Sequence, residues 1–110
     1  MSSKLHKHAN LLRALHRASP RIRKRLLHDY CSGDFVCCIV ECVKNVLKGN
    51  VPLSPAQKKK LKSKKKHLRQ MILKKTSLTK KRKLIQTGGF LGALLGPIVS
   101  VLGSLFNGPR

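Results

Sequence analysis

Apolar residues recur every three to four positions in the first part of the chain, which is the period of one face of an α-helix. Leu12 and Leu15 belong to the first such face, and the pattern predicts an amphipathic helix over residues 5–18. A second helix is predicted over residues 20–30, with basic residues crowded opposite its apolar side. Ser19-Pro20 suits its start, because serine caps free backbone amides and proline fits the first helical turn.

Residues 34–48 are apolar around most of a helix circumference, which predicts the buried centre of the fold. Their β-branched content also fits a strand, but 15 residues without a turn are long for one. Ser32-Gly33-Asp34 is a suitable helix start and Gly49-Asn50 a suitable stop. We expect the three helices to form one compact unit, and we do not expect the last two to be a helix-turn-helix, because no recognition helix is defined.

A long basic run follows the short connector 51–53, and Ser54-Pro55 before it repeats the Ser-Pro helix start. Residues 58–83 contain 14 Lys or Arg and no acid, with leucines such as Leu61 and Leu68 forming a thin apolar stripe. The pattern fits either a long Lys-rich helix or a tract that is disordered when free. Like charges three or four positions apart destabilise an isolated helix by about 0.2–0.5 kcal/mol per pair. We therefore expect a helix here where a packed neighbour or bound phosphate supports it.

The last part of the chain changes character, because residues 90–106 contain no charged side chain. A helix of 17 residues would be about 25 Å long, close to the lower limit for spanning a bilayer. Gly92 and Gly96 form a G-x3-G pattern that lets helices approach closely, and Pro97 predicts a hinge between two short helices. So large an uncovered apolar segment predicts self-association or contact with a membrane.

The charge balance narrows the class of partner. The chain has 110 residues with 25 Lys and Arg against three acids, a net charge of +22, and such self-repulsion favours binding to a polyanion. Nucleic acid and an anionic membrane surface are the two candidates, and a ribosome-like RNA binder would explain the charge but not the tail. The chain has no Trp and one Tyr, which argues against base stacking. Lysine predominates over arginine in the basic run, so we expect binding that is independent of sequence.

The four cysteines, Cys31, Cys37, Cys38 and Cys42, lack the paired C-x2-C spacing of a zinc site. We expect them to act as small buried apolar residues of a reduced, intracellular protein, with His28 and Cys31 as a weak alternative metal pair. With three acids, no paired carboxylates and no histidine beside a nucleophile, the chain is not expected to be an enzyme or to hold a cofactor.

A basic block, then Gly-Gly, then an uncharged tail, over residues 80–98, resembles the precursor of the small basic core protein (X or mu) of adenoviruses. Residues 46–54, ahead of the lysine run, extend the likeness to the X-type proteins of Polinton/Maverick elements and adintoviruses. This second resemblance covers most of residues 10–106. It implies a virion core protein that condenses double-stranded DNA, located in the host nucleus and in the virion.

The resemblance also implies roles for particular residues. Proteins of this kind mature by cysteine-protease cleavage near Gly-Gly, which makes Gly88 and Gly89 a candidate processing site. The cleavage pattern has Met, Ile or Leu two positions before the first glycine, where this chain has Gln86. The implied DNA-contacting residues are the cations of the basic run: Lys58, Lys59, Lys60, Lys62, Lys64, Lys65, Lys66, Arg69, Lys74, Lys75, Lys80, Lys81, Arg82 and Lys83.

Together these observations predict an all-α protein in three regions. Residues 1–50 form a small helical unit, residues 51–87 the nucleic-acid-binding region, and residues 88–110 the apolar tail. The predicted function is sequence-independent binding and condensation of double-stranded DNA, with the tail used for self-association or for contact with a capsid. The alternative is a membrane-active or membrane-anchored protein, in which the tail inserts and each basic residue adds about 1 kcal/mol at anionic headgroups.

Overall fold

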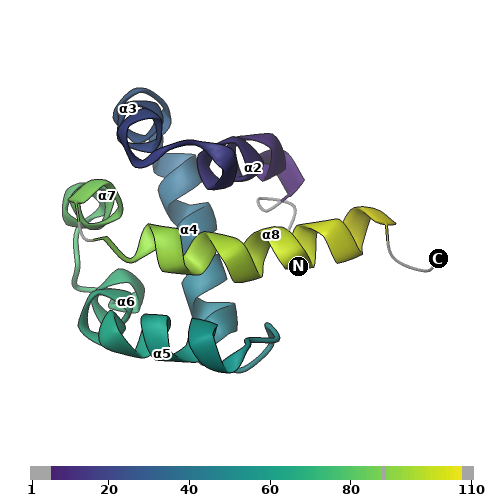
Figure 1. Cartoon of the computed structure of the whole chain (residues 1–110). Coiled ribbons are helices and arrows are strands. Elements are labelled where there is room, and N and C mark those ends of the chain that lie inside the picture. The colour runs from purple at the N-terminus through teal and green to yellow at the C-terminus, as the bar shows by residue number, and fades with distance from the viewer. Residues whose placement is uncertain (1–5, 88, 108–110) are drawn as a thin grey trace.

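The computed structural model describes residues 6–87 and 89–107, with side chains up to Leu102. Within these residues the chain forms seven α-helices and no strand, which confirms the all-α prediction. Figure 1 shows how they are arranged around one another. The helices are α2 (Ala9–Arg17), α3 (Pro20–Tyr30), α4 (Gly33–Leu47), α5 (Pro55–Ser63), α6 (Lys65–Ile72), α7 (Leu78–Thr87) and α8 (Leu91–Asn107).

Four helices begin at a serine that caps free backbone amides. The hydroxyls of Ser19, Ser32, Ser54 and Ser77 each accept a hydrogen bond from the backbone N–H three residues on, at 3.1–3.4 Å. At α5 the side chain of Gln57 also accepts from the backbone N–H of Ser54 at 2.9 Å, which completes a capping box. The starts of α3 and α5 and the first-turn acid of α4 follow the pattern expected from the sequence.

Helix α4 ends at the glycine that the sequence indicates. Gly49 has φ of +80°, a left-handed conformation that residues with a side chain rarely adopt. Its N–H donates to the carbonyl of Val46 at 3.1 Å, and the N–H of Asn50 donates to the carbonyl of Asn45 at 2.9 Å. This pair of bonds is a Schellman motif, which satisfies carbonyls that the helix end leaves free.

The basic run is not one long helix, as the sequence suggested, but the three helices α5, α6 and α7. The first break is at Lys64, where φ and ψ are −107° and 15°. It turns the chain because α5 packs against α8 whereas α6 packs against α4. A second turn, between Leu73 and Ser77, brings α7 back to contact α3, α4 and α6. Each segment is helical against packed neighbours, the condition under which we expected helix in so basic a sequence.

The apolar C-terminal segment is one helix, and the predicted hinge at Pro97 is wrong. Helix α8 continues through Pro97 although proline removes one backbone hydrogen bond. Leu94, Leu95 and Ile98, on both sides of the proline, are each about 1% exposed, so packing on neighbouring elements holds both halves in line. The segment is therefore not an uncovered tail, because α2 and α5 pack against it.

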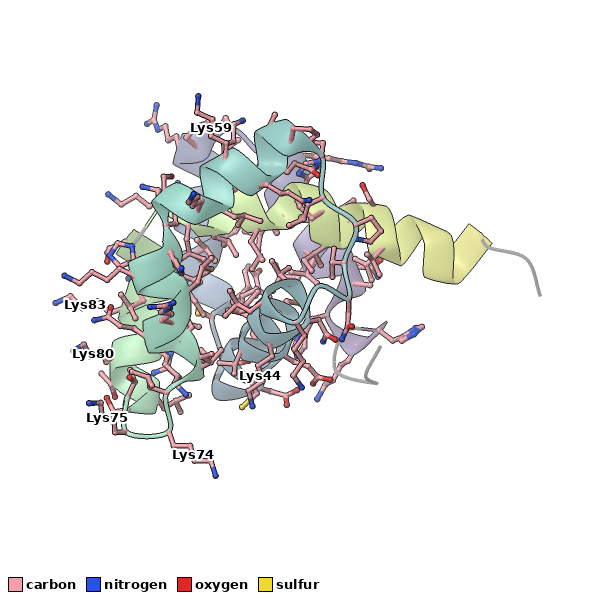
Figure 2. The ribbon with its side chains drawn as sticks, turned by 90° about the horizontal axis from the view of Figure 1, so that it is seen from below. Lys44, Lys59, Lys74, Lys75, Lys80 and Lys83 are labelled. Atoms are coloured by element: carbon pink, nitrogen blue, oxygen red, sulfur yellow. The ribbon has the colours of Figure 1, made fainter. Side chains whose placement is uncertain are left out.

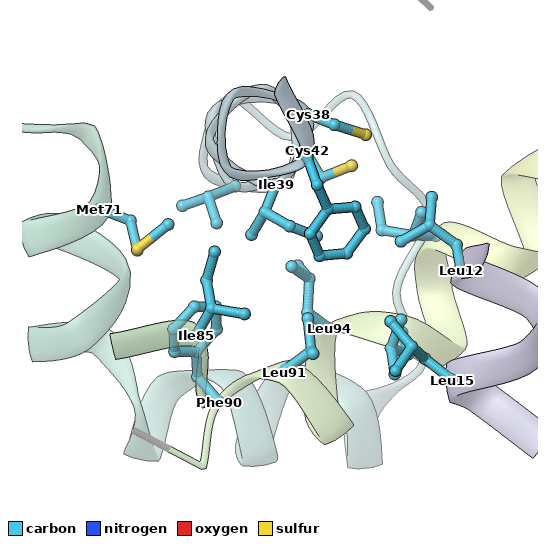
Figure 3. Packing of buried hydrophobic residues seen from close by; sticks show 14 of the residues in the cluster. Leu12, Leu15, Cys38, Ile39, Cys42, Met71, Ile85, Phe90, Leu91 and Leu94 are labelled. Atoms are coloured by element: carbon cyan, nitrogen blue, oxygen red, sulfur yellow. The ribbon is translucent and has the colours of Figure 1, made fainter. Parts of the chain in front are cut away.

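The helices share one hydrophobic core. Figure 3 shows Ile39 of α4, Ile85 of α7 and Leu94 of α8 pointing toward one another, with Met71 of α6 beside them and Leu12 of α2 at the other end. All five side chains are at most 2% exposed. Burying such a side chain stabilises the fold by about 1.5–3 kcal/mol relative to leaving it exposed. Side chains from all three regions distinguished in the sequence belong to this cluster.

The molecule has a radius of gyration of 13.1 Å and principal extents of 38 × 26 × 26 Å. A compact domain of this length is expected to have a radius of gyration of about 13 Å, so the basic segments are folded onto the core and do not extend from it.

Candidate nucleic-acid interface

The basic side chains of α5, α6 and α7 project from a folded surface. In Figure 2, Lys75, Lys80 and Lys83 point outward along one side of the molecule, with Lys74 at its end in the turn between α6 and α7, and Lys59 points outward from α5 on the adjoining side. Of the fourteen cations predicted to contact DNA, all are exposed except Lys64, Lys81 and Arg82, which are half-buried. We call the exposed cations of residues 58–83 the lysine face.

The lysine face follows from the spacing of the few apolar residues in this segment. Leu61, Leu68, Met71 and Ile85 are each at most 4% exposed and attach α5, α6 and α7 to the core. A helix buries only the side that carries these residues, so the lysines between them are left on the solvent side. The apolar stripe recognised in the sequence therefore determines where the charge is displayed.

Arg82 is the predicted contact residue with the clearest structural role. Its Nε donates a hydrogen bond to the carbonyl oxygen of Cys31, at the end of α3, over 2.8 Å. One helical turn further, the side-chain amide of Gln86 donates to the carbonyl of Leu27 at 3.2 Å. These bonds hold α7 against α3. The Cys31 thiol has a raised pKa because it is buried, and the neighbouring Arg82 charge opposes that rise.

Lys64 and Lys81 lie in grooves and not on the lysine face. Lys81 lines a groove of about 570 Å³ between α4 and α7, together with Glu41 and two further lysines, Lys44 and Lys48. Lys64 lines a groove of about 420 Å³ between α5 and α8 and places its ammonium group beside Gly89. Neither lysine is displayed to solvent as fully as its neighbours in sequence.

The acids of the protein are segregated from the lysine face. Asp34 pairs with Lys7 at 2.8 Å and with His8 at 3.1 Å, and hydrogen bonds from both hold the pKa of the Asp34 carboxyl below its usual range. Asp29 contacts its neighbour His28 at 3.2 Å. Within the described part of the chain, no basic side chain of α5, α6 or α7 pairs with an acid. The positive charge of the face is therefore not neutralised from within.

Known proteins add nothing to this description. No protein-family model, curated protein or solved structure matches the chain. The resemblance to adenovirus-type core proteins thus stays a prediction, and function has to be inferred from the surface itself.

The structure also exposes cations that the sequence-based assignment left out. Arg21, Lys24 and Arg25 are exposed on α3, Lys44 is exposed on α4, and Lys48 is exposed at the C-terminal cap of α4. The clustering of basic residues on one side of residues 20–30 was visible in the sequence. These cations were not among the predicted DNA-contacting residues, because the family resemblance implies a role only for the lysine run.

Three of the four cysteines behave as the sequence suggested. Cys31, Cys38 and Cys42 are buried, whereas Cys37 is exposed on α4. The hydrogen bond of the Cys42 thiol with Cys38 and its burial in the core favour the protonated form, so the pKa of this thiol lies far above its usual range. Among the residues with described positions, no group of three or more His, Cys, Asp or Glu is placed to hold a metal ion.

The candidate processing site is only half described. Gly88 lies outside the described residues. Gly89 is exposed and has φ of +75°, two residues before the first residue of α8.

None of the described helices is by itself long and apolar enough to cross a membrane. The segments Leu78–Thr87 and Leu91–Leu102 together have the length and composition of a membrane span, but their axes are bent by 93° relative to each other.

Proposed function

We propose that this protein binds double-stranded DNA through the phosphate backbone, without sequence preference, using the lysine face. The observation that supports this most strongly is the exposure of cations from α5, α6 and α7 on adjoining sides of a packed domain, with no acid paired to them among the described residues. A folded scaffold holds these charges close together before binding, so their repulsion is relieved when phosphates neutralise them.

The residue types on the face favour phosphate over base recognition. Lysine ends in a compact, mobile charge that suits a phosphate, whereas arginine is the better reader of base edges. Residues 55–87 contain no Phe, Tyr or Trp side chain on which a base could stack. Each phosphate that a lysine neutralises releases counterions, so affinity would come mainly from salt-sensitive contacts.

The total charge and the size of the molecule suit the coating of a duplex. At about one negative charge per 1.7 Å, a duplex segment of about 37 Å carries the charge that would balance +22. The extents of the molecule across its long axis are 26 Å, shorter than that segment, so one copy bound through the lysine face carries enough charge to neutralise the duplex that it covers. Neutralised duplexes no longer repel one another, which supports condensation. The setting that we propose is the virion core implied by the family resemblance.

The membrane alternative has less support. The leucine-rich side of α8 that would enter lipid packs instead in the core, where Leu91, Leu94 and Leu102 are at most 2% exposed. Insertion would require the folded domain to open.

The test compares two variants that lose the same charge from different places. Lys80→Gln with Lys83→Gln removes two cations of the lysine face, and Lys44→Gln with Lys48→Gln removes two exposed cations of α4. We expect the α7 variant to reduce the slope of log affinity against log salt by about 1.8, which at 0.1 M salt weakens random-sequence duplex binding by up to about 60-fold. The α4 variant should bind nearly as the parent does. Equal losses in both variants would argue for diffuse attraction with no defined face.

A further inference from the structure

Helix α7 has a basic helix on each side. It packs against both α3 and α6, and Figure 1 shows α3, α7 and α6 one above another along one side of the molecule. Neighbouring helices pack with axes about 8–10 Å apart, so α3 and α6 flank α7 at a separation of about 16–20 Å. The surface around α7 is therefore wider than the lysine face alone.

The position of α3 beside α7 is fixed by specific bonds. The Arg82–Cys31 and Gln86–Leu27 hydrogen bonds, of 2.8 and 3.2 Å, join the facing sides of the two helices at successive turns. They leave the outward side of α7, with Lys80 and Lys83, exposed between its neighbours. The cations of α3 thus have a defined place relative to those of α7.

The flank of α3 next to α7 is basic. Lys24 is exposed and lines a groove of about 210 Å³ whose other wall includes Gln86 and Thr87 of α7. Arg21 and His28 lie within one turn of Lys24 on the same helix, and both are exposed. The acid of this helix, Asp29, is occupied with His28 at 3.2 Å. Cations therefore continue from α7 across this groove onto α3.

We infer that α3 is a second wall of the interface, so that one backbone strand of a duplex contacts α3 and the other contacts α6, with α7 facing the groove between them. This rests on the proposed function of the lysine face. The major groove of B-DNA is about 12 Å wide, and lysine and arginine side chains reach inward from helices about 16–20 Å apart to phosphates at that spacing. A single strand offers one row of phosphates, which can occupy one wall at a time.

The experiment measures binding to a random-sequence duplex and to one of its strands, across a salt series, with the full-length chain. Arg21→Gln with Lys24→Gln removes two exposed cations of α3. The control is Lys44→Gln with Lys48→Gln, which removes the same charge from α4. Thermal unfolding of each variant establishes that it is folded as the parent is.

We expect the α3 variant to lose about 1.8 from the salt slope for the duplex, because each lost phosphate contact removes about 0.9. Binding to the single strand should change no more than in the α4 control, so the preference for duplex falls. If the salt slope for the duplex is the same in the α3 variant as in the α4 control, α3 is not a second wall of the interface. The same conclusion follows if the α3 variant loses equal affinity for the duplex and for the single strand. These results leave the lysine face intact, since that proposal is tested separately by the Lys80 and Lys83 substitutions.

Discussion

The Nε of Arg82 lies 2.8 Å from the carbonyl oxygen of Cys31, a residue 51 positions earlier in the chain. The bond fastens the C-terminal end of α3 to the middle of α7. A residue that resembles its lysine neighbours in sequence thus serves to position the helix that displays them. Arg82 stabilises the packing of α7, whereas its lysine neighbours supply the exposed charge, and single substitutions can distinguish these two roles.

Arg82→Gln should destabilise the fold, whereas Lys83→Gln should not. Losing a hydrogen bond from a charged, half-buried group costs about 1–2 kcal/mol, and an exposed substitution stays within about 0.5 kcal/mol. At about 4–8 °C of Tm per kcal/mol, the two variants are distinguishable by thermal unfolding followed by circular dichroism. DNA affinity should show the reverse order once both variants are folded. Equal Tm values would mean that the Arg82 bond contributes nothing to stability.

The C-terminal helix should be essential to the fold. Leu94→Ala removes a side chain that is 1% exposed and should cost about 2–5 kcal/mol of unfolding free energy. Leu73→Ala is the matched control, because that leucine is 40% exposed and should cost about 1 kcal/mol or less. A chain ending at Gly89 should lose cooperative unfolding, since it lacks the whole of α8. If the shortened chain keeps a sharp melting transition, the rest of the domain folds without α8.

Acid should weaken the fold partly through Asp34. Its pKa is lowered by hydrogen bonds from Lys7 and His8, so the folded state binds a proton less readily there than the unfolded state does. The stabilisation is complete above the ordinary aspartate pKa of about 3.9 and is lost as the pH falls through the lowered value. Urea unfolding of Asp34→Asn should therefore depend less on pH below about 4 than that of the parent.

Asp29→Asn is the control for this pH dependence. Asp29 is exposed on α3, and among the described residues its carboxylate pairs only with the adjacent His28. Its removal should leave the acid-induced loss of stability in place. If the two variants and the parent all lose stability in parallel, the Asp34 pairs make no net contribution to folding.

Thiol reactivity should single out one cysteine. Cys37 is exposed, and Cys31, Cys38 and Cys42 are at most 8% exposed. Brief treatment of the native protein with iodoacetamide at mildly alkaline pH should label Cys37 and leave the buried thiols for modification after unfolding, as peptide mass mapping would show. Equally fast labelling of Cys42, whose thiol pKa is strongly raised, would contradict its burial in α4.

Local features of the fold were predictable from the sequence. The serines at Ser19, Ser32 and Ser54 mark helix starts because capping depends on residues within one turn. The apolar residues around most of the circumference of residues 34–48 indicated a buried helix, because a helix covered on several sides needs apolar side chains on each of them, and Phe35 is fully buried. The glycine stop at Gly49 was equally local.

Features that depend on distant partners were not predictable. The break at Lys64 exists because α5 and α6 pack against different helices, which no local pattern records. The apolar segment after Gly89 was expected to be uncovered because the elements that cover it, α2 and α5, are separated from it in sequence. Arg82 and Lys83 are adjacent cations, and only the carbonyl of Cys31 distinguishes their roles.

The most direct test of the central claim is the affinity of the unmodified chain for two duplexes of unrelated sequence across a salt series. If about ten cations engage phosphates, log affinity should fall against log salt with a slope near −9, and the two sequences should give superimposable lines. A flat dependence on salt, or strong binding to one sequence alone, would contradict backbone recognition by the lysine face.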